Sequence, residues 1–178
     1  MKKLLYLLFL TLAAGIVCAQ QRISDIRPGE PCAGILELEK RLGTLALPDQ
    51  AESGISRFSG NQGGKDAEIE YHCEEGSLTE QRIRVLFPTR EEAYRFAREQ
   101  RAELSKRLGE PIHDGLDLAG WRKLYFGFMG ADLDYLTMVV VWGRAKEDAM
   151  LMVRETETKK WQVTISQGSS KVEYILNS

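Results

Sequence analysis

The stretch FPTREEAYRFAREQRAELSKRLG, residues 87–109, decides how the rest of the chain is arranged. Thr89 and Glu92 have the spacing of a capping box, in which the threonine side chain accepts a bond from the backbone N–H three residues later. Apolar residues then recur at helical spacing. Gly109 and Pro111 end the pattern. The sequence therefore predicts one long amphipathic helix, and its arginines form a solvated face because glutamates interrupt them throughout.

The start of the chain has the pattern of a secretory signal peptide, with two lysines, an apolar run over residues 4–17 and the small residue Ala19 before the cleavage point. The run is shorter than the ~20 residues of a membrane-spanning helix, and no later stretch approaches that length. Val17 stands before Cys18, where a lipobox has Gly, Ala or Ser, which argues against a lipid anchor. We expect residues 1–19 to be removed and the mature protein to be periplasmic or secreted, without a transmembrane segment.

The charge balance limits the partners of the protein. The formal net charge of the full chain is −2, and loss of Lys2 and Lys3 with the signal peptide makes the mature chain more acidic. Nothing in this balance recruits nucleic acid or an anionic membrane.

Two cysteines, Cys32 and Cys73, remain after the signal peptide. An even number of cysteines in an exported chain predicts a disulfide between them. Closing a loop of that length would stabilise the fold by roughly 4 kcal/mol.

The remaining sequence indicates a mixture of helix and strand. A short helix follows Pro31 and ends at Gly43, and residues 67–73 alternate apolar with polar side chains, as a half-buried strand does. Residues 83–87 continue as a strand into the long helix. After that helix, four further segments are predicted as strands, namely residues 121–128, 135–142, 149–153 and 161–166. The fold class is therefore α+β, an antiparallel sheet with helices packed on one face.

Three sequence matches at nearly one offset indicate an internal duplication. The matched pairs are residues 37–43 with 103–109, residues 58–60 with 125–127, and Gly76 with Gly143. They predict two tandem helix-plus-three-strand units, the first over residues 20–88 with the disulfide and the second over residues 89–178 with the long helix.

Several short motifs resemble one known module. They are the segment Ile26-Arg27-Pro28-Gly29, the helix end Arg41-Leu42-Gly43 and the strand and turn Ile69-Glu70-Tyr71-His72-Cys73-Glu74-Glu75-Gly76. Together they resemble the helix-plus-meander module of the SmpA/OmlA barrel-assembly lipoproteins and of the β-lactamase inhibitory protein, which carries two such units. The resemblance covers the first unit better than the second. It implies an exported, non-catalytic module that binds another protein through its sheet.

The sequence contains little that points to catalysis or to a bound metal. His72 and Cys73 are neighbours on one strand and point to opposite faces, so they cannot jointly bind one ion without distortion. His113 and Asp114 could pair in a loop, but no nucleophile motif accompanies them. Three acidic pairs, Glu74 with Glu75, Asp132 with Asp134 and Glu155 with Glu157, fall at predicted turns, where carboxylates are solvated. We predict no metal and no cofactor.

Two function classes stay open. The first is a non-catalytic protein-binding module of the cell envelope, which includes assembly accessories, inhibitors and immunity proteins. Its partner would be another envelope or secreted protein, or a second copy of the chain. The second is a periplasmic hydrolase that uses dispersed carboxylates and His113. An enzyme requires a concave pocket with convergent polar groups, whereas a binding module requires an exposed apolar surface.

One candidate partner face can be named from the strands of the second unit. Residues 135–142 and 149–153 are apolar on both faces instead of alternating. Methionines beside a tryptophan form an adaptable apolar surface. We expect one shared face to carry Met138, Val140, Trp142, Met150 and Met152. This face is either exposed for a partner or buried under a second layer of the fold.

Overall fold

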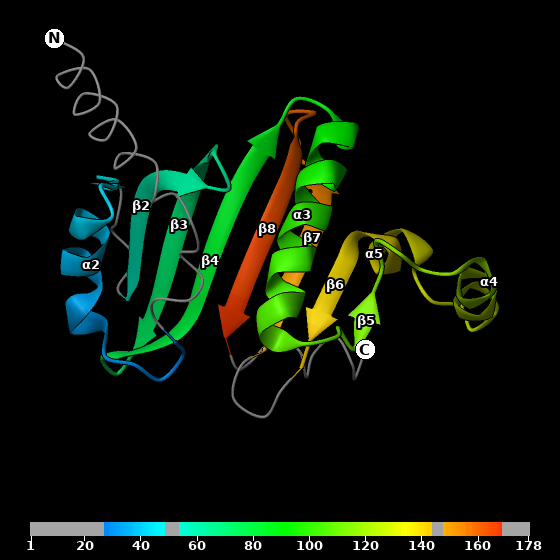
Figure 1. Ribbon diagram of the computed structural model, residues 1–178, viewed down its shortest axis with the longest axis horizontal. Helices are drawn as coiled ribbons and strands as arrows, with labels where there is room; N and C mark the ends of the chain where they lie inside the picture. The colour runs from blue at the N-terminus through cyan, green and yellow to red at the C-terminus, as the bar shows by residue number, and fades with distance from the viewer. Residues whose placement is uncertain (1–26, 49–53, 144–147, 169–178) are drawn as a thin grey trace, which may run out of the picture.

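An eight-stranded antiparallel sheet organises the computed structural model of the protein, which describes residues 27–48, 54–143 and 148–168 (Figure 1). The strand order is β1-β2-β3-β4-β8-β7-β6-β5. The strands are β1 (Leu45–Ala46), β2 (Ile55–Gln62), β3 (Lys65–Glu74), β4 (Ser77–Phe87), β5 (His113–Asp114), β6 (Val139–Trp142), β7 (Ala149–Glu155) and β8 (Trp161–Gly168). Each half of the chain supplies four neighbouring strands, and the halves join where β4 pairs with β8. The predicted α+β class is confirmed.

In the described ranges, five helical segments accompany the sheet: η3 (Cys32–Gly34), α2 (Ile35–Arg41), α3 (Arg90–Leu108), α4 (Gly120–Phe128) and α5 (Leu133–Met138). The long predicted helix is α3. Its cap forms as expected, because the Thr89 hydroxyl accepts a hydrogen bond from the Glu92 backbone N–H at 3.3 Å. Gly109 follows the last turn at φ 82°, a conformation that favours glycine.

One face of the sheet is apolar across its width and forms the main core. The register aligns Ile69, Ile83, Ile165, Leu151 and Val140 in one row over five strands, and all five are buried. Helix α3 covers the part of this face over β8 and β7 (Figure 1). Helix α2 packs on the same core through Ile35. The expectation of helices on one face is therefore confirmed for α2 and α3.

A buried hydrogen-bond network attaches α2 to the sheet. Tyr71 donates its hydroxyl proton to Glu39 at 2.5 Å, and Gln81 donates to the Tyr71 oxygen at 3.1 Å. Thr44 donates to the second oxygen of Glu39 at 2.7 Å. The Glu39 side chain is fully buried, and these bonds satisfy a carboxylate that would otherwise be costly there.

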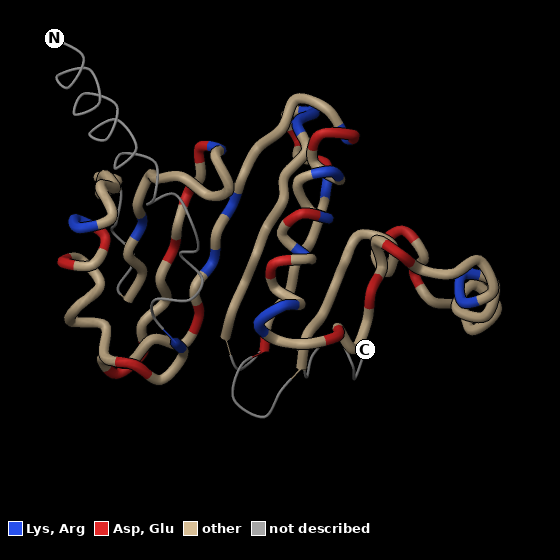
Figure 2. The backbone as a smooth tube through the Cα atoms, viewed as in Figure 1, with Lys and Arg blue, Asp and Glu red and all other residues tan. Residues whose placement is uncertain are grey.

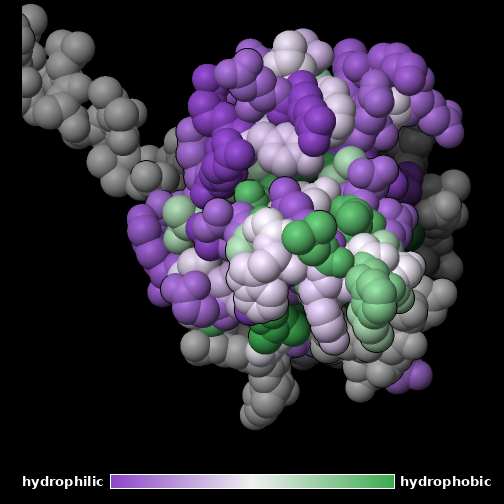
Figure 3. All heavy atoms as spheres, turned by 90° about the vertical axis from the view of Figure 1, so that its right-hand side faces the viewer, coloured by the Kyte–Doolittle hydropathy of each residue, from purple (hydrophilic) through white to green (hydrophobic). Residues whose placement is uncertain are grey.

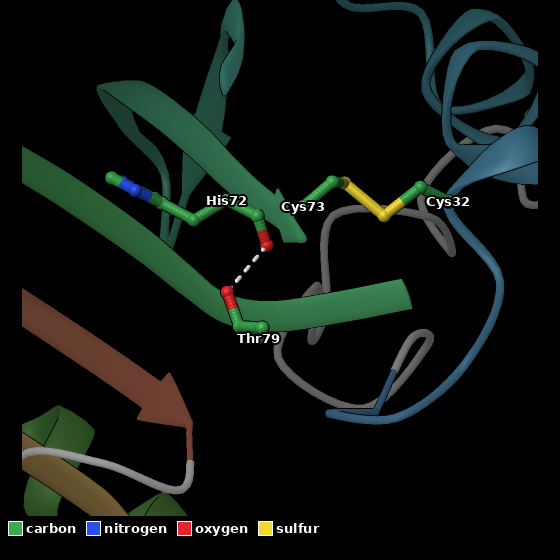
Figure 4. Close-up of a disulfide and its surroundings, with 4 residues drawn as sticks. All are labelled: Cys32, His72, Cys73 and Thr79. Carbon is green, nitrogen blue, oxygen red and sulfur yellow. Dashed lines mark hydrogen bonds between the residues drawn. A yellow bond between two sulfur atoms is a disulfide. The ribbon is translucent and has the colours of Figure 1, made fainter. Parts of the chain in front are cut away.

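The predicted disulfide is confirmed. Cys32 in η3 is bonded to Cys73 near the end of β3 (Figure 4). His72 points away from the sulfur atoms, as expected for neighbouring residues on a strand, and its carbonyl accepts a hydrogen bond from Thr79 at 3.0 Å.

Two of the strand predictions are wrong. Residues 121–128 form helix α4, and the first part of residues 135–142 forms helix α5, so that only Val139–Trp142 is strand. Asp132 begins α5 as its N-cap and accepts a hydrogen bond from the Tyr135 backbone N–H at 3.1 Å. The sequence match between residues 58–60 and 125–127 therefore pairs a strand with a helix.

The ends of α2 and α3 are alike. Residues 37–43 and residues 103–109 each contain the end of a helix followed by a glycine with positive φ. The two segments that match in sequence therefore also have similar local structure. The duplication itself stays a prediction. Signal cleavage and Cys18 lie outside the described residues.

Candidate functional site

A helical arm extends from the β5 end of the sheet. We call residues 120–138, which contain α4, α5 and their connection, the arm (Figure 1). Helix α4 meets the remainder of the chain mainly through Phe126, whose ring centroid lies 6.3 Å from that of His113. Phe126 is the one residue of α4 that is not exposed. The two arm helices are closely packed, because a Cβ atom on Gly127 would lie 3.3 Å from the Leu133 side chain.

One exposed face of α4 is apolar. Residues 121, 124, 125 and 128 recur at i, i+3, i+4 and i+7, the spacing of one helix face, and residue 129 extends it. The exposed fractions are 67% for Trp121, 79% for Leu124, 57% for Tyr125, 90% for Phe128 and 64% for Met129. We call these five residues the apolar stripe. In Figure 3 hydrophobic residues gather on the side of the molecule from which the arm extends.

The apolar stripe is comparable in size to the largest apolar patch of an ordinary monomer. A whole aromatic side chain has an area of about 150–250 Å². Multiplied by the exposed fractions of Trp121, Tyr125 and Phe128, this gives a total exposed aromatic area on the order of 400 Å². The largest apolar patch on an ordinary monomer is about 300–600 Å², and Leu124 and Met129 add to the aromatic area. A surface of this extent is typical of a binding site, whereas exposed single leucines such as Leu36 need no such explanation.

Charges of opposite sign lie at the two ends of the apolar stripe. Arg122 and Lys123 stand in the first turn of α4, and the Arg122 guanidinium lies 5.4 Å from the centre of the Trp121 ring. Asp132 and Asp134 stand at the start of α5. Within the described ranges, no ion pair involves any of these four side chains. The arm is therefore basic at one end of its apolar surface and acidic at the other.

The partner face predicted from the sequence does not exist as one surface. Val140 and Trp142 face α3 in the main core, and Trp142 donates its indole N–H to the Gly109 carbonyl at 3.1 Å. Met150 lies on the opposite side of the sheet, because the register places it beside Val141 instead of Val140. Val140, Trp142 and Met150 are all buried. Met152 packs half-buried near Met150, and Met138 is half-buried at the end of α5.

The side of the sheet opposite α3 is charged over β3 and β4. Glu70, only 1% exposed, lies at the centre of a cluster that includes Arg57 at 2.8 Å, Arg84 at 2.7 Å and Arg82 at 3.4 Å. Acidic positions on β3 and basic positions on β4 are visible as neighbouring red and blue segments in Figure 2. Burial alone would raise the pKa of Glu70, but hydrogen bonds from Arg84 and Arg57 and the nearby positive charges lower it overall.

An open groove of about 740 Å³ crosses the same side of the sheet. Its lining includes Arg84, Glu68, Arg154, Thr156 and Gln162. Arg84 is already paired with Glu68 at 3.1 Å and with Glu70, and Arg154 is near the Gln162 side-chain oxygen at 3.5 Å. These polar groups bond to one another, so they do not converge on a point where a reacting atom could sit.

The structure does not assemble the residues of the hydrolase alternative. His113 contacts the Leu136 carbonyl through Nε2 at 2.8 Å, and Asp114 forms an ion pair with Arg101. Among the acidic pairs, Asp132 caps α5 and Glu155 lies 3.7 Å from Lys159 in a turn. Glu155 and Glu157 line a smaller open groove of about 390 Å³ at the turn between β7 and β8, but His113 does not line it.

Within residues 27–48, 54–143 and 148–168, no group of three or more His, Cys, Asp or Glu side chains is placed to hold a metal ion. In the same ranges, no helix is both long enough and apolar enough to cross a membrane.

Sequence reasoning missed the arm, although its signal was present. The spacing of Trp121, Leu124, Tyr125 and Phe128 has the helical period, but tryptophan, tyrosine and phenylalanine also favour strands.

Comparison of the chain with protein-family models, with curated proteins and with solved structures found no match.

Proposed function

We propose that this protein is an exported, non-catalytic protein-binding module and that the apolar stripe of α4 is its binding surface. The observation that carries the proposal is the exposure of four large apolar side chains on one face of α4 and of Met129 directly after it. Export is supported by the Cys32–Cys73 disulfide, since such bonds persist in oxidising compartments such as the periplasm.

The chemistry of the stripe favours a protein as the partner. Tryptophan, tyrosine and arginine are the residues that most often dominate the energy of protein interfaces, and Trp121, Arg122 and Tyr125 are all exposed here. An amphipathic helix with anchors at i, i+3, i+4 and i+7 is a recurrent mode of recognition, in which the apolar side enters a complementary groove. An assembly accessory, an inhibitor or an immunity protein would all use such a surface.

Affinity capture with matched variants tests the proposal. Mature protein would be immobilised and exposed to an envelope extract, beside the double variant Leu124→Asp/Phe128→Asp and the control Leu36→Asp, which alters an exposed leucine on α2. We expect the wild type and the control to retain the same polypeptide and the double variant to lose it. Equal retention by all three folded proteins would refute the arm as the binding surface.

A further inference from the structure

We infer that the partner of the arm is a second copy of this chain, and that two arms pack antiparallel about a two-fold axis through their apolar stripes. The inference rests on the proposed function, because it names the protein that the arm binds. It is carried by the distribution of charge along the arm and by the apolar area that the arm exposes.

The charges of the arm complement a second arm in the antiparallel orientation. Arg122 and Lys123 lie at the start of α4, and Asp134 lies beyond its end, in the first turn of α5. In an antiparallel pair, the start of each α4 lies beside the end of the other. A two-fold axis then brings the basic end of each arm to the acidic end of its partner. One rotation therefore pairs the charges at both ends of the interface.

A parallel pair is disfavoured by the same charges. It would place Arg122 and Lys123 of both copies side by side, and Asp134 beside its own equivalent. From Leu118 to Ala131 the sequence contains no acidic residue that could separate the basic groups. Like charges opposed at an interface cost free energy, so the charge pattern selects the antiparallel arrangement.

The exposed apolar area supplies a large part of what a dimer interface requires. A standard interface buries about 800 Å² on each partner. The three aromatic residues of the stripe supply about half of this, and Leu124, Met129 and the charged ends are positioned to add to it. The other large exposed apolar residues of the described chain, such as Leu36, Leu45 and Leu86, lie on separate elements and form no comparable stripe.

Analytical ultracentrifugation of the mature protein over a range of concentrations tests the dimer. We expect a reversible monomer–dimer equilibrium for the wild type and for Leu36→Asp. Leu124→Asp/Phe128→Asp should weaken association by roughly 100-fold or more, because it places charges at the centre of the interface. A wild type that stays monomeric would overturn the inference. So would a dimer that persists in the folded double variant.

Charge reversal and mixing test the antiparallel orientation. Arg122→Glu/Lys123→Glu makes both ends of the arm acidic, and Asp134→Lys weakens its acidic end; Asp132 is left intact because it caps α5. Each variant alone should associate about tenfold more weakly than the wild type. An equimolar mixture should recover association as a heterodimer, detected with one fluorescently labelled variant. In a parallel pair Asp134→Lys would instead remove a contact between like charges and associate more strongly than the wild type. That result, or no recovery on mixing, would overturn the antiparallel pairing.

The inference and the proposed function can fail separately. A monomeric wild type whose stripe still captures a different polypeptide would remove the second copy and keep the binding function. A stripe that neither dimerises nor captures a polypeptide would remove both. Binding of the monomer to phosphatidylglycerol vesicles through the stripe, without self-association, would also remove both, since the partner would then be lipid.

Discussion

At the scale of single residues, Glu70 shows how a buried charge is held on the open side of the sheet. Its carboxylate contacts guanidinium groups on β2 and β4, and the arginine side chains are between 18% and 30% exposed. They cover the carboxylate while keeping part of each guanidinium group in water. The cluster therefore joins three neighbouring strands with little uncompensated charge.

The lowered pKa of Glu70 predicts a pH dependence of stability. A carboxylate with a folded-state pKa below its ordinary value of 4.5 stabilises the fold above that pH, and the contribution is lost as the pH falls through the folded-state pKa. Glu70→Gln should therefore lower the free energy of unfolding by about 1–3 kcal/mol near neutral pH, less than for a fully buried pair because the arginines reach solvent. The difference from the wild type should shrink in acid.

Urea denaturation at a series of pH values measures this effect. Glu68→Gln is the matched control, since Glu68 lies on the same strand and pairs with Arg84 but is 43% exposed. It should change stability by a few tenths of a kcal/mol at every pH. A Glu70→Gln deficit that stayed constant down to strongly acidic pH would show that the arginines do not lower the pKa of Glu70.

At the scale of elements, the signals that are local in sequence predicted the structure best. Helix α3 has its cap, its apolar period and its terminal glycine within one stretch, and all three signals agree. Helix α4 was missed because its aromatic residues favour strands while their spacing is helical. Its exposure could not be derived from a pattern that equally describes a buried helix.

The pairing of β6 with β7 could not be predicted from the sequence, for a different reason. Both strands are apolar on both faces, so alternation does not identify the face of each residue, and a shift of one residue exchanges the faces. The sequence therefore grouped Val140 with Met150, whereas the register pairs Val140 with Leu151. The cysteine pair was predictable because only two cysteines follow the predicted signal segment, residues 1–19.

Two methionines test which apolar elements are core and which are surface. Met150 packs against Val139 and Val141 and is 8% exposed, whereas Met129 at the end of α4 is 64% exposed. Met150→Asp should lower the free energy of unfolding by about 3–5 kcal/mol, because it buries an unpaired charge. Met129→Asp should change it by less than about 0.5 kcal/mol.

Urea denaturation of both variants, at a concentration where the wild type is monomeric, compares the same substitution in two environments. Similar midpoints for the two variants would contradict the assignment of Met150 to the interior and of Met129 to the surface.

At the scale of the whole molecule, the two halves of the chain form one sheet and one core. Strands β4 and β8 pair over their length, and the main core contains residues of both halves, such as Ile69 and Leu151. Opposite that core, the sheet changes from charged over β3 and β4 to apolar near β6 and β7. The arm lies beyond this apolar end and carries most of the large exposed apolar side chains of the described chain. A folded body with one exposed apolar arm is the arrangement that a binding module requires.

Site-specific photo-crosslinking in cells that produce the protein tests the binding function of the arm most directly. A photoreactive amino acid would replace Phe128, which is 90% exposed on α4, and in a parallel strain Leu36 on α2 as a control. We predict that illumination gives a defined polypeptide adduct from position 128 and none from position 36. The absence of a polypeptide adduct at position 128, or equal adducts at both positions, would contradict the account.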